Sequence, residues 1–369
     1  MPTLKDLRNL GQSAWLDFIE RDFMARGELK ALIDRGLSGV TSNPSIFAGA
    51  IVDSQAYDGQ IQNLAEAGSS VRQAYESLVI TDIQQACDLL RPVYDETAGV
   101  DGYVSLEASP DLADDTQKTI EEVAHFHQVV ARPNLMVKIP ATEAGYPAIQ
   151  DAIGRGININ ITLMFSLEQY DRVAEAYLAG LEALNAAAGD VANVASVASF
   201  FVSRIDTKLD KQLDEIGETS IRGKIGIANA KMAYQRFQQT FHGDRWQRLA
   251  VRGARLQRVL WGSTSTKDPA YRDTMYVDGL IGPHTINTLP PETLEAFVDH
   301  GTASRTVDQD LEAAQQHLER LEEVGISLDQ VTGELLEEGL DKFARSFDDL
   351  MSSLERQLDR AKSTPAKAG

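Results

Sequence analysis

Cysteine is almost absent from this sequence. The 369 residues include one, Cys87, so no disulfide can form within the chain. Structural disulfides belong to oxidising compartments, and a single thiol suits a reducing one. Cys87 has apolar neighbours in a helical pattern, which predicts a core position. The first residues, Met1 to Asp6, carry early charges and no apolar core of signal-peptide length. We therefore expect a cytoplasmic protein.

Long apolar runs and an excess of positive charge are also missing. No segment approaches the ~20 apolar residues that cross a membrane, so we expect no membrane partner. Lysine and arginine number 35 against 55 aspartates and glutamates, which gives a formal net charge of -20. Nucleic acids and anionic membranes bind basic surfaces, so neither is an expected partner. If an anionic small molecule binds, a few local cations and backbone N–H groups must hold it.

Several familiar enzyme motifs are lacking. The sequence has no phosphate-loop motif, no Gly-rich dinucleotide fingerprint after its first strand-like segment and no G-x-S-x-G turn. His125 and His127 lie two residues apart in a helical pattern, so their rings diverge and cannot chelate one metal ion. The other histidines are scattered. These patterns offer no metal site and no nucleotide site.

Short apolar segments alternate with helical ones along most of the chain. Strand-like segments cover residues 13–18, 40–41, 103–107, 135–139, 158–165, 194–202, 258–263 and 276–280. About eight strands separated by helices, without antiparallel hairpins, predict an α/β fold. The pattern favours a (β/α)8 barrel over an open doubly wound sheet.

The C-terminal part of the chain has a different composition. Beyond Gly301 it is rich in Glu, Gln, Leu and Asp, with leucines and phenylalanines at helical spacing. This predicts helices over 302–360 that pack on the barrel and contribute stability, not chemistry. Residues 361–369 are predicted to form a disordered tail. We thus predict one domain over 1–369, a barrel with additional C-terminal helices.

One strand carries a residue that does not suit a core. The segment Asn134–Thr142, N-L-M-V-K-I-P-A-T, resembles a buried parallel strand, yet Lys138 stands in its middle. Side chains alternate along a strand, so Lys138 shares a face with Met136. The lysine either snorkels to water or is held in a partly apolar pocket. In such a pocket burial disfavours the charge and leaves an amine that can attack a carbonyl.

Other polar residues also fall at predicted strand ends. The C-terminal strand ends of a (β/α)8 barrel form its active-site face. The polar residues there are Asp17, Asn43, Glu107, Lys138, Asn160, Thr162, Ser199, Arg204 and Ser263. Each alone has an ordinary explanation, such as a helix cap, an ion pair or a good strand former. Two carboxylates, an amine and several amides on one face are harder to explain as packing, so we predict an active site.

Five segments resemble signatures of the transaldolase family. They read G-V-T-S-N-P-S-I-F, L-M-V-K-I-P-A-T, I-N-I-T-L-M-F-S, L-W-G-S-T-S-T-K and L-I-G-P-H-T-I-N-T-L-P. The resemblance runs from about Leu10 to Phe347. It implies a (β/α)8 barrel that uses no metal and no organic cofactor. It also implies transfer of a dihydroxyacetone unit between sugar phosphates. The donor would be sedoheptulose 7-phosphate or fructose 6-phosphate, and the acceptor glyceraldehyde 3-phosphate or erythrose 4-phosphate.

The resemblance implies a catalytic role for four residues. Lys138 matches the nucleophile that forms a Schiff base. Asp17 matches the acid/base that handles the C4 hydroxyl proton during carbon–carbon cleavage. Glu107 and Thr162 match the pair that positions the water used to form and hydrolyse the imine. The residue types suit this chemistry, since an iminium acts as an electron sink while a carboxylate removes the proton.

A second set of residues is implied to bind substrate. Asn43, Asn160 and, less directly, Ser199 match residues that hold donor hydroxyls. Arg204 and Ser263 match phosphate ligands. Some family members have an arginine soon after this serine, whereas here the run is T-S-T-K, ending at Lys267. We therefore predict Lys267 as the substitute for that second cation.

Three functions fit these patterns. The favoured one is a cytoplasmic transaldolase of the pentose phosphate pathway, a monomer or small homo-oligomer. A Schiff-base aldolase on the same barrel would instead release free dihydroxyacetone or its phosphate. Phe201 favours transfer, because a tyrosine there would suit hydrolytic release better in related aldolases. A non-catalytic sugar-phosphate-binding barrel is disfavoured, because the lysine and both carboxylates remain.

Overall fold

Eight parallel strands pair in sequence order and close into a barrel. The computed structural model describes residues 1–52 and 54–363. The strands are β1 (Gln12–Leu16), β2 (Gly39–Thr41), β3 (Tyr103–Glu107), β4 (Leu135–Pro140), β5 (Ile159–Met164), β6 (Ser196–Phe201), β7 (Arg258–Gly262) and β8 (Thr285–Leu289). The predicted (β/α)8 barrel is confirmed.

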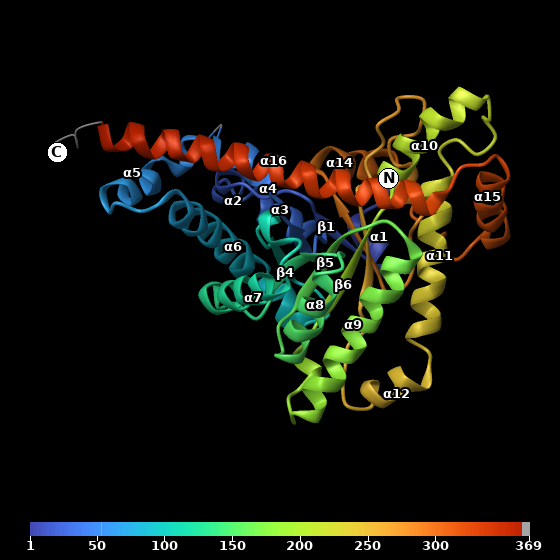
Figure 1. Ribbon diagram of the computed structural model, residues 1–369, viewed down its shortest axis with the longest axis horizontal. Helices are drawn as coiled ribbons and strands as arrows, with labels where there is room; N and C mark the ends of the chain where they lie inside the picture. The colour runs from blue at the N-terminus through green and yellow to red at the C-terminus, as the bar shows by residue number, and fades with distance from the viewer. Residues whose placement is uncertain (53, 364–369) are drawn as a thin grey trace.

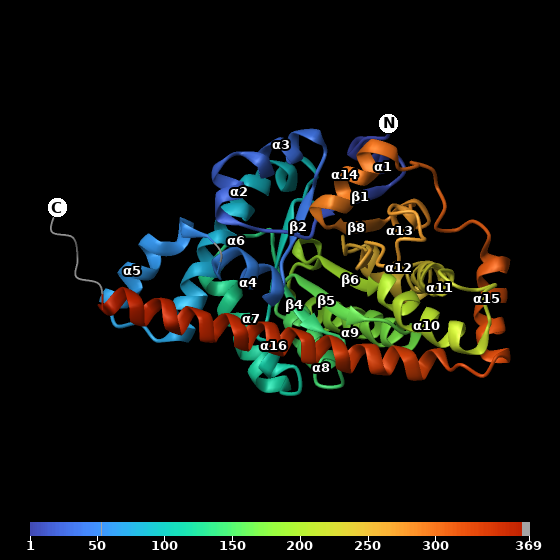
Figure 2. The ribbon, with the colours of Figure 1, turned by 90° about the horizontal axis from the view of Figure 1, so that it is seen from above.

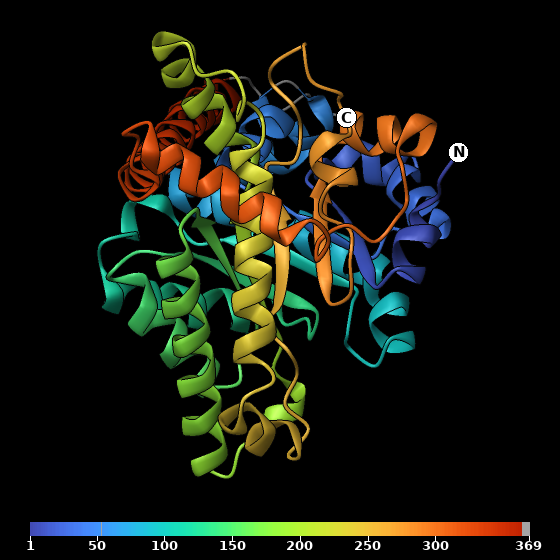
Figure 3. The same cartoon turned by 90° about the vertical axis from the view of Figure 1, so that its right-hand side faces the viewer.

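Helices connect the strands and surround the barrel (Figure 1). They are α1 (Leu4–Asn9), α2 (Arg21–Ala25), α3 (Glu28–Arg35), α4 (Pro44–Val52), α5 (Asp58–Glu66), α6 (Val71–Glu96), α7 (Thr116–Val130), α8 (Gly145–Gly154), α9 (Leu167–Ala186), α10 (Ser203–Ile216), α11 (Ile225–Thr240), α12 (Asp244–Ala250), α13 (Met275–Asp278), α14 (Pro291–His300), α15 (Leu311–Glu323) and α16 (Leu328–Ser363). Three short 3-10 turns are η1 (Gln55–Tyr57), η2 (Pro110–Leu112) and η3 (Val191–Asn193). Figure 3 shows α9 and α11 side by side on the outside of the barrel, with α15 packed against α11.

The last strand lies later in the chain than the sequence indicated. The predicted strand at 276–280 is wrong, since Met275–Asp278 forms the short helix α13. The hydroxyl of Tyr276 donates to Asp206 Oδ2 at 2.9 Å, so this apolar run packs against α10. A short apolar run does not distinguish strand from buried helix. The segment Thr285–Leu289 pairs instead with both β7 and β1 and closes the barrel.

The barrel interior is filled in layers. Its middle layer is apolar and comprises Trp15, Tyr103, Met136, Val197, Leu260 and Ile286, joined by Ala195. A Cβ atom at Gly39 would lie 2.4 Å from the Trp15 indole, so glycine makes room for this ring. Side chains two residues further along each strand share the same face. They therefore point into the interior at the C-terminal end of the barrel.

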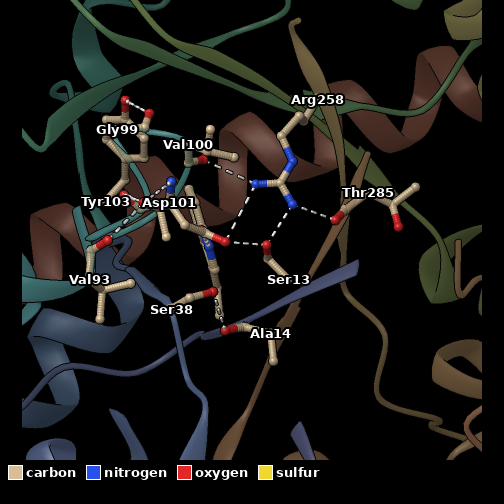
Figure 4. Close-up of polar contacts among 12 residues, drawn as sticks. Ser13, Ala14, Ser38, Val93, Gly99, Val100, Asp101, Tyr103, Arg258 and Thr285 are labelled. Atoms are coloured by element: carbon tan, nitrogen blue, oxygen red, sulfur yellow. Dashed lines mark hydrogen bonds and ion pairs between the residues drawn. The ribbon is translucent and has the colours of Figure 1, made fainter. Parts of the chain in front are cut away.

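A buried polar cluster closes the N-terminal end of the barrel (Figure 4). Arg258 Nη2 donates to Ser13 Oγ at 2.6 Å and to the Thr285 carbonyl at 2.8 Å. Its guanidinium lies 3.6 Å from Asp101 Oδ2, and Asp101 Oδ1 accepts from Trp15 Nε1 at 2.7 Å. Ser13 also donates to Asp101. Each charge has partners, as a buried ion pair requires. The paired charges of Arg258 and Asp101 thus stabilise the N-terminal end of the barrel.

Helix α16 crosses the C-terminal face of the barrel. It spans 36 residues and contacts β5, α4, α5, α6 and α10 (Figure 2). Its inward stripe includes Phe343, Phe347, Leu350, Leu354 and Leu358, all buried. The predicted C-terminal helices are thus present as α15 and α16. The predicted tail begins too early, because α16 continues to Ser363. The remaining residues, 364–369, lie outside the described part of the chain.

Leu350 tests how much α16 stabilises the barrel. Its side chain is fully buried, so Leu350→Ala should lower the free energy of unfolding by roughly 2–5 kcal/mol. The adjacent, exposed Asp349 is the control, and Asp349→Ala should change it by less than ~0.5 kcal/mol. Urea unfolding followed by circular dichroism measures both. If chain 1–369 is one domain, the loss shifts a single transition. Two separate transitions would contradict this.

Candidate active site

Strand register brings Lys138 and Glu107 together. Glu107 on β3 lies opposite Lys138 on β4, and Lys138 lies opposite Asn160 on β5. Neighbouring strands are ~4.8 Å apart, so these side chains meet on the interior face. Lys138 Nζ donates to Glu107 Oε2 at 2.9 Å and to the Ser42 carbonyl at 3.0 Å. The lysine side chain is 6% exposed, which rules out the alternative that it snorkels to water.

Burial also changes the Glu107 carboxyl. It raises the pKa of Glu107, although the nearby Lys138 and Arg204 partly oppose it. A carboxyl group of this kind takes up a proton more readily than an exposed glutamate. Because it lies within hydrogen-bond distance of Lys138 Nζ, a proton can pass between the two groups. The amine can therefore lose its proton without transfer to bulk water.

Asp17 supplies a second carboxylate at the end of β1. Its backbone N–H donates to the Leu289 carbonyl at 2.8 Å and so extends the pairing of β1 with β8 by one residue. This bond fixes the position of the Asp17 backbone. Asp17 Oδ1 accepts from Thr41 Oγ1 at 2.6 Å, and Thr41 in turn lies 2.6 Å from Thr288 Oγ1. Burial raises the pKa of Asp17, against the charge of Lys138 and the Thr41 hydrogen bond. Asp17 is thus an oriented carboxylate with increased affinity for a proton.

Amide and hydroxyl groups complete this layer. Asn160 Oδ1 accepts from Ser199 Oγ at 2.6 Å, and its Nδ2 donates to Ser105 Oγ at 3.0 Å, so the amide is fixed. The Oδ1 of Asn43 accepts from the Ile46 N–H at 3.0 Å and caps α4, as the sequence indicated. Thr162 Oγ1 is buried and has no hydrogen-bond partner within the described residues. That hydroxyl is available to a bound molecule.

Cations gather at the outer end of the site. Arg204 is the second residue of α10, and its guanidinium lies 5.0 Å above the Phe201 ring. Ser263 follows β7 in a left-handed conformation, with φ at 54°, and its Oγ lies 2.9 Å from Ser203 Oγ. Lys267 Nζ donates to Ser265 Oγ at 2.7 Å. Neither Arg204 nor Lys267 forms an ion pair within the described part of the chain.

One cavity of about 200 Å³ joins these groups. Nine predicted residues line it: Asp17, Asn43, Lys138, Thr162, Ser199, Phe201, Arg204, Ser263 and Lys267. Glu107 and Asn160 lie just behind the lining, hydrogen-bonded to Lys138 and Ser199 respectively. The structure therefore places all the predicted residues at one site.

Sequence reasoning missed other members of the lining. They include Thr41, Ser265, Thr288, Lys342 and Phe343. Thr41 could have been found, since it lies two residues after Gly39 and so shares its inward face. Thr288 was missed because its strand was placed at 276–280. Lys342 and Phe343 come from α16, and no local pattern distinguishes them from other residues of an amphipathic helix.

Among residues 1–52 and 54–363, no group of three or more His, Cys, Asp or Glu side chains could hold a metal ion. No helix in this part of the chain is both long enough and apolar enough to cross a membrane. The His125 ring contacts Glu76 at 3.3 Å on the outside of the barrel. Cys87 is buried, as predicted.

The fold and the site together define a class of protein. The site combines a buried lysine, an adjacent carboxylate and a second carboxylate that lines the same cavity. At the C-terminal end of a (β/α)8 barrel, this set of residues is typical of an enzyme that forms a lysine imine. Residues 14–354 match the family model described as transaldolase/fructose-6-phosphate aldolase. The chain belongs to this transaldolase family.

Individual relatives agree over nearly their whole length. The chain is 46% identical to a transaldolase of Trichodesmium erythraeum, over 97% of this chain and 98% of the relative. It is 48% identical to a transaldolase of Thermobifida fusca, over 96% and 98%. It is 44% identical to a transaldolase of Mycolicibacterium smegmatis, over 98% and 99%.

Proposed function

We propose that this protein is a transaldolase of the pentose phosphate pathway. It transfers a dihydroxyacetone unit from fructose 6-phosphate or sedoheptulose 7-phosphate to glyceraldehyde 3-phosphate or erythrose 4-phosphate. The observation that carries this proposal is the buried contact of 2.9 Å between Lys138 Nζ and Glu107, in reach of a cavity that Asp17 also lines. A cytoplasmic location and a monomeric or small oligomeric state belong to the same proposal.

The reaction begins with an addition to the donor. Neutral Lys138 Nζ attacks the C2 carbonyl of the ketose phosphate, and the carbonyl oxygen becomes a hydroxyl. Glu107 takes a proton from the amine and supplies one to that hydroxyl, which leaves as water and gives the iminium ion. Thr162 Oγ1, which has no hydrogen-bond partner among the described residues, holds this water together with Glu107. The same two residues position a water for hydrolysis at the end of the cycle.

Asp17 then acts as the general base for cleavage. It removes the proton of the C4 hydroxyl, the C3–C4 bond breaks, and the electron pair of that bond moves into the iminium to give an enamine. The remainder of the sugar leaves as an aldehyde. When an acceptor aldehyde binds, the enamine attacks its carbonyl carbon and Asp17 returns the proton to the new hydroxyl. Asn43, Asn160 and Ser199 are the proposed ligands of the donor hydroxyls.

The outer cations suit the phosphate end of the substrate. Arg204 can bind two phosphate oxygens at once, since its fork of donors matches them. It also lies in the first turn of α10, where the helix dipole favours an anion. Ser263 and Lys267 line the same cavity. In a chain of net charge -20, these local groups are what would hold an anionic substrate.

Acceptor dependence tests the proposed function. The purified protein is given fructose 6-phosphate with and without erythrose 4-phosphate, and glyceraldehyde 3-phosphate formation is followed by a coupled enzyme. Rapid turnover only with the acceptor is the result expected of a transaldolase. Equal turnover without it, with free dihydroxyacetone accumulating, would identify an aldolase. Binding without turnover under either condition would identify a sugar-phosphate-binding barrel.

Arg204→Ala should impair phosphorylated substrates selectively. A charge-assisted contact contributes ~1.5–3 kcal/mol, so KM for glyceraldehyde 3-phosphate should rise about 10- to 100-fold. The rate with unphosphorylated glyceraldehyde, at a donor concentration that saturates the variant, should change little. Lys211→Ala is the control, because Lys211 is an exposed cation on the same helix outside the cavity. Equal losses with both acceptors would make Arg204 structural.

A further inference from the structure

The C-terminal helix forms part of the active-site wall. Lys342 and Phe343 on α16 line the same cavity as Lys138, although they are far from it in sequence. Phe343 is 5% exposed and belongs to the apolar cluster that contains Phe201 and Leu163. Lys342, its neighbour, is exposed on the side that faces the cavity mouth. The sequence predicted that this helix serves stability alone, so its place in the lining needs a reason.

Specific contacts hold α16 against the site on both sides of Lys342. A Cβ atom at Gly339 would lie 2.9 Å from Leu163 Cδ2 and 3.5 Å from Arg204 Nη1, so the helix backbone passes close to this arginine. Lys208 on α10 pairs with Glu338 at 2.6 Å, and with Glu334 as well. On the other side, Ser346 Oγ lies 2.8 Å from Ser45 Oγ on α4. Lys342 is thereby fixed over the cavity between α10 and α4.

Three cations converge at the outer end of the cavity, whereas Asp17 lines it beside Lys138 and pairs with none of them. Lys342, Arg204 and Lys267 all line the cavity, and within the described residues none of them forms an ion pair. Lys208, only one turn along α10 from Arg204, is paired twice. Partial desolvation at the cavity wall lowers the pKa of Lys342, and the positive charges of Arg204 and Lys267 lower it further. Such repulsion in an acidic protein is relieved by an anion that all three can contact.

We propose that Lys342 is a ligand of the substrate phosphate, so that α16 is part of the substrate-binding site. This inference rests on the proposed transaldolase function and extends it. Arg204 binds phosphate oxygens through its fork of donors, whereas Lys342 and Lys267 contribute compact point charges. Lys342 lines the same cavity as Ser263 and Lys267, the residue predicted to replace the arginine that some family members have after this serine. The segment after β7 contributes one positive charge to the cavity, that of Lys267, and α16 contributes a second, that of Lys342.

Removal of the Lys342 charge gives the test. In Lys342→Ala, KM for fructose 6-phosphate and the inhibition constant of inorganic phosphate should both rise about tenfold, and kcat should stay within about twofold. Lys342→Arg should recover most of the loss. Arg345→Ala is the matched control: Arg345 is an exposed cation one turn further along α16 and does not line the cavity. It should leave all three constants unchanged.

Several results would overturn the inference. If Lys342→Ala behaves like Arg345→Ala, Lys342 does not contact phosphate. If both variants weaken binding equally, the general field of the helix is responsible. Equal melting temperatures for the two variants establish that a change in binding is not a change in folding. Calorimetric titration with inorganic phosphate needs no turnover. Weaker phosphate binding by Lys342→Ala would support the inference even if the wild-type protein transferred nothing, which would refute only the proposed function.

Discussion

Lys138→Met is expected to abolish transfer and leave the fold intact. Methionine retains much of the apolar stem and removes the amine, so no imine can form. Loss of a covalent nucleophile should lower kcat by on the order of 10⁴ or more. The partner left behind is Glu107, whose pKa burial raises, so this carboxyl can take up a proton and stay buried without a charge. Circular dichroism and the melting temperature should therefore match those of the wild type.

Controls separate the amine from the charge. Lys138→Arg keeps a positive charge but should be equally inactive, because guanidinium does not lose its proton in proteins. Lys231→Met removes another buried lysine, which donates to the Gln309 carbonyl far from the cavity, and should retain transfer activity. Measurable transfer by Lys138→Met would refute the mechanism.

Borohydride trapping locates the covalent bond directly. Reduction during turnover with fructose 6-phosphate converts the imine to a stable secondary amine. Mass spectrometry should then find a dihydroxyacetone-sized adduct on the peptide that contains Met136 to Thr142. An adduct on another lysine would move the nucleophile elsewhere and overturn the roles assigned to Glu107 and Asp17 as well.

Asp17→Asn should separate imine formation from carbon–carbon cleavage. Asparagine preserves the size of the side chain and can still accept the hydrogen bond from Thr41, but it cannot act as a base. General base catalysis contributes ~10²–10⁴-fold, so kcat should fall by that factor. Because Lys138 and Glu107 remain, borohydride should now trap the uncleaved six-carbon sugar phosphate on Lys138.

The mass of the adduct decides the role of Asp17. A six-carbon phosphorylated adduct places the block after imine formation and before cleavage. A dihydroxyacetone-sized adduct would show that cleavage proceeds without Asp17, and another base would have to be found. Asp349→Asn, an exposed aspartate on α16, is the control and should behave like the wild type.

The alternation of side chains made much of the barrel predictable. In a strand, apolar residues alternate with a period of two, and this alternation is visible in the local sequence. Helices between successive strands imply that the strands pair in parallel. Seven strands were placed within a few residues of their observed positions. The eighth was misplaced because the apolar run at 276–280 resembles a strand, and the Pro, Gly and Asn residues after it predicted a loop. Thr285–Leu289 forms the eighth strand because it pairs with both β1 and β7. The pairing with β1 joins segments far apart in the chain, so local sequence does not reveal it.

The inner part of the site was also implicit in the sequence. Once the chain forms a parallel barrel, all C-terminal strand ends lie on one face, so polar residues at those ends must lie near one another. The sequence alone therefore predicted that Asp17, Glu107 and Lys138 gather there. It did not predict the register that sets Glu107 opposite Lys138, because register depends on how neighbouring strands shift as the barrel closes.

The position of Lys342 in the cavity wall was determined by tertiary structure alone. Within α16 the sequence distinguishes an apolar stripe from a polar face, and a lysine on the polar face is indistinguishable from one that faces water. Its position over the cavity comes from the close approach of Gly339 to Arg204 and from the attachments of α16 to α10 and α4. These contacts join residues far apart in the chain. Local periodicity carries no information about them, because it records which face of a helix is buried and not what that face is buried against.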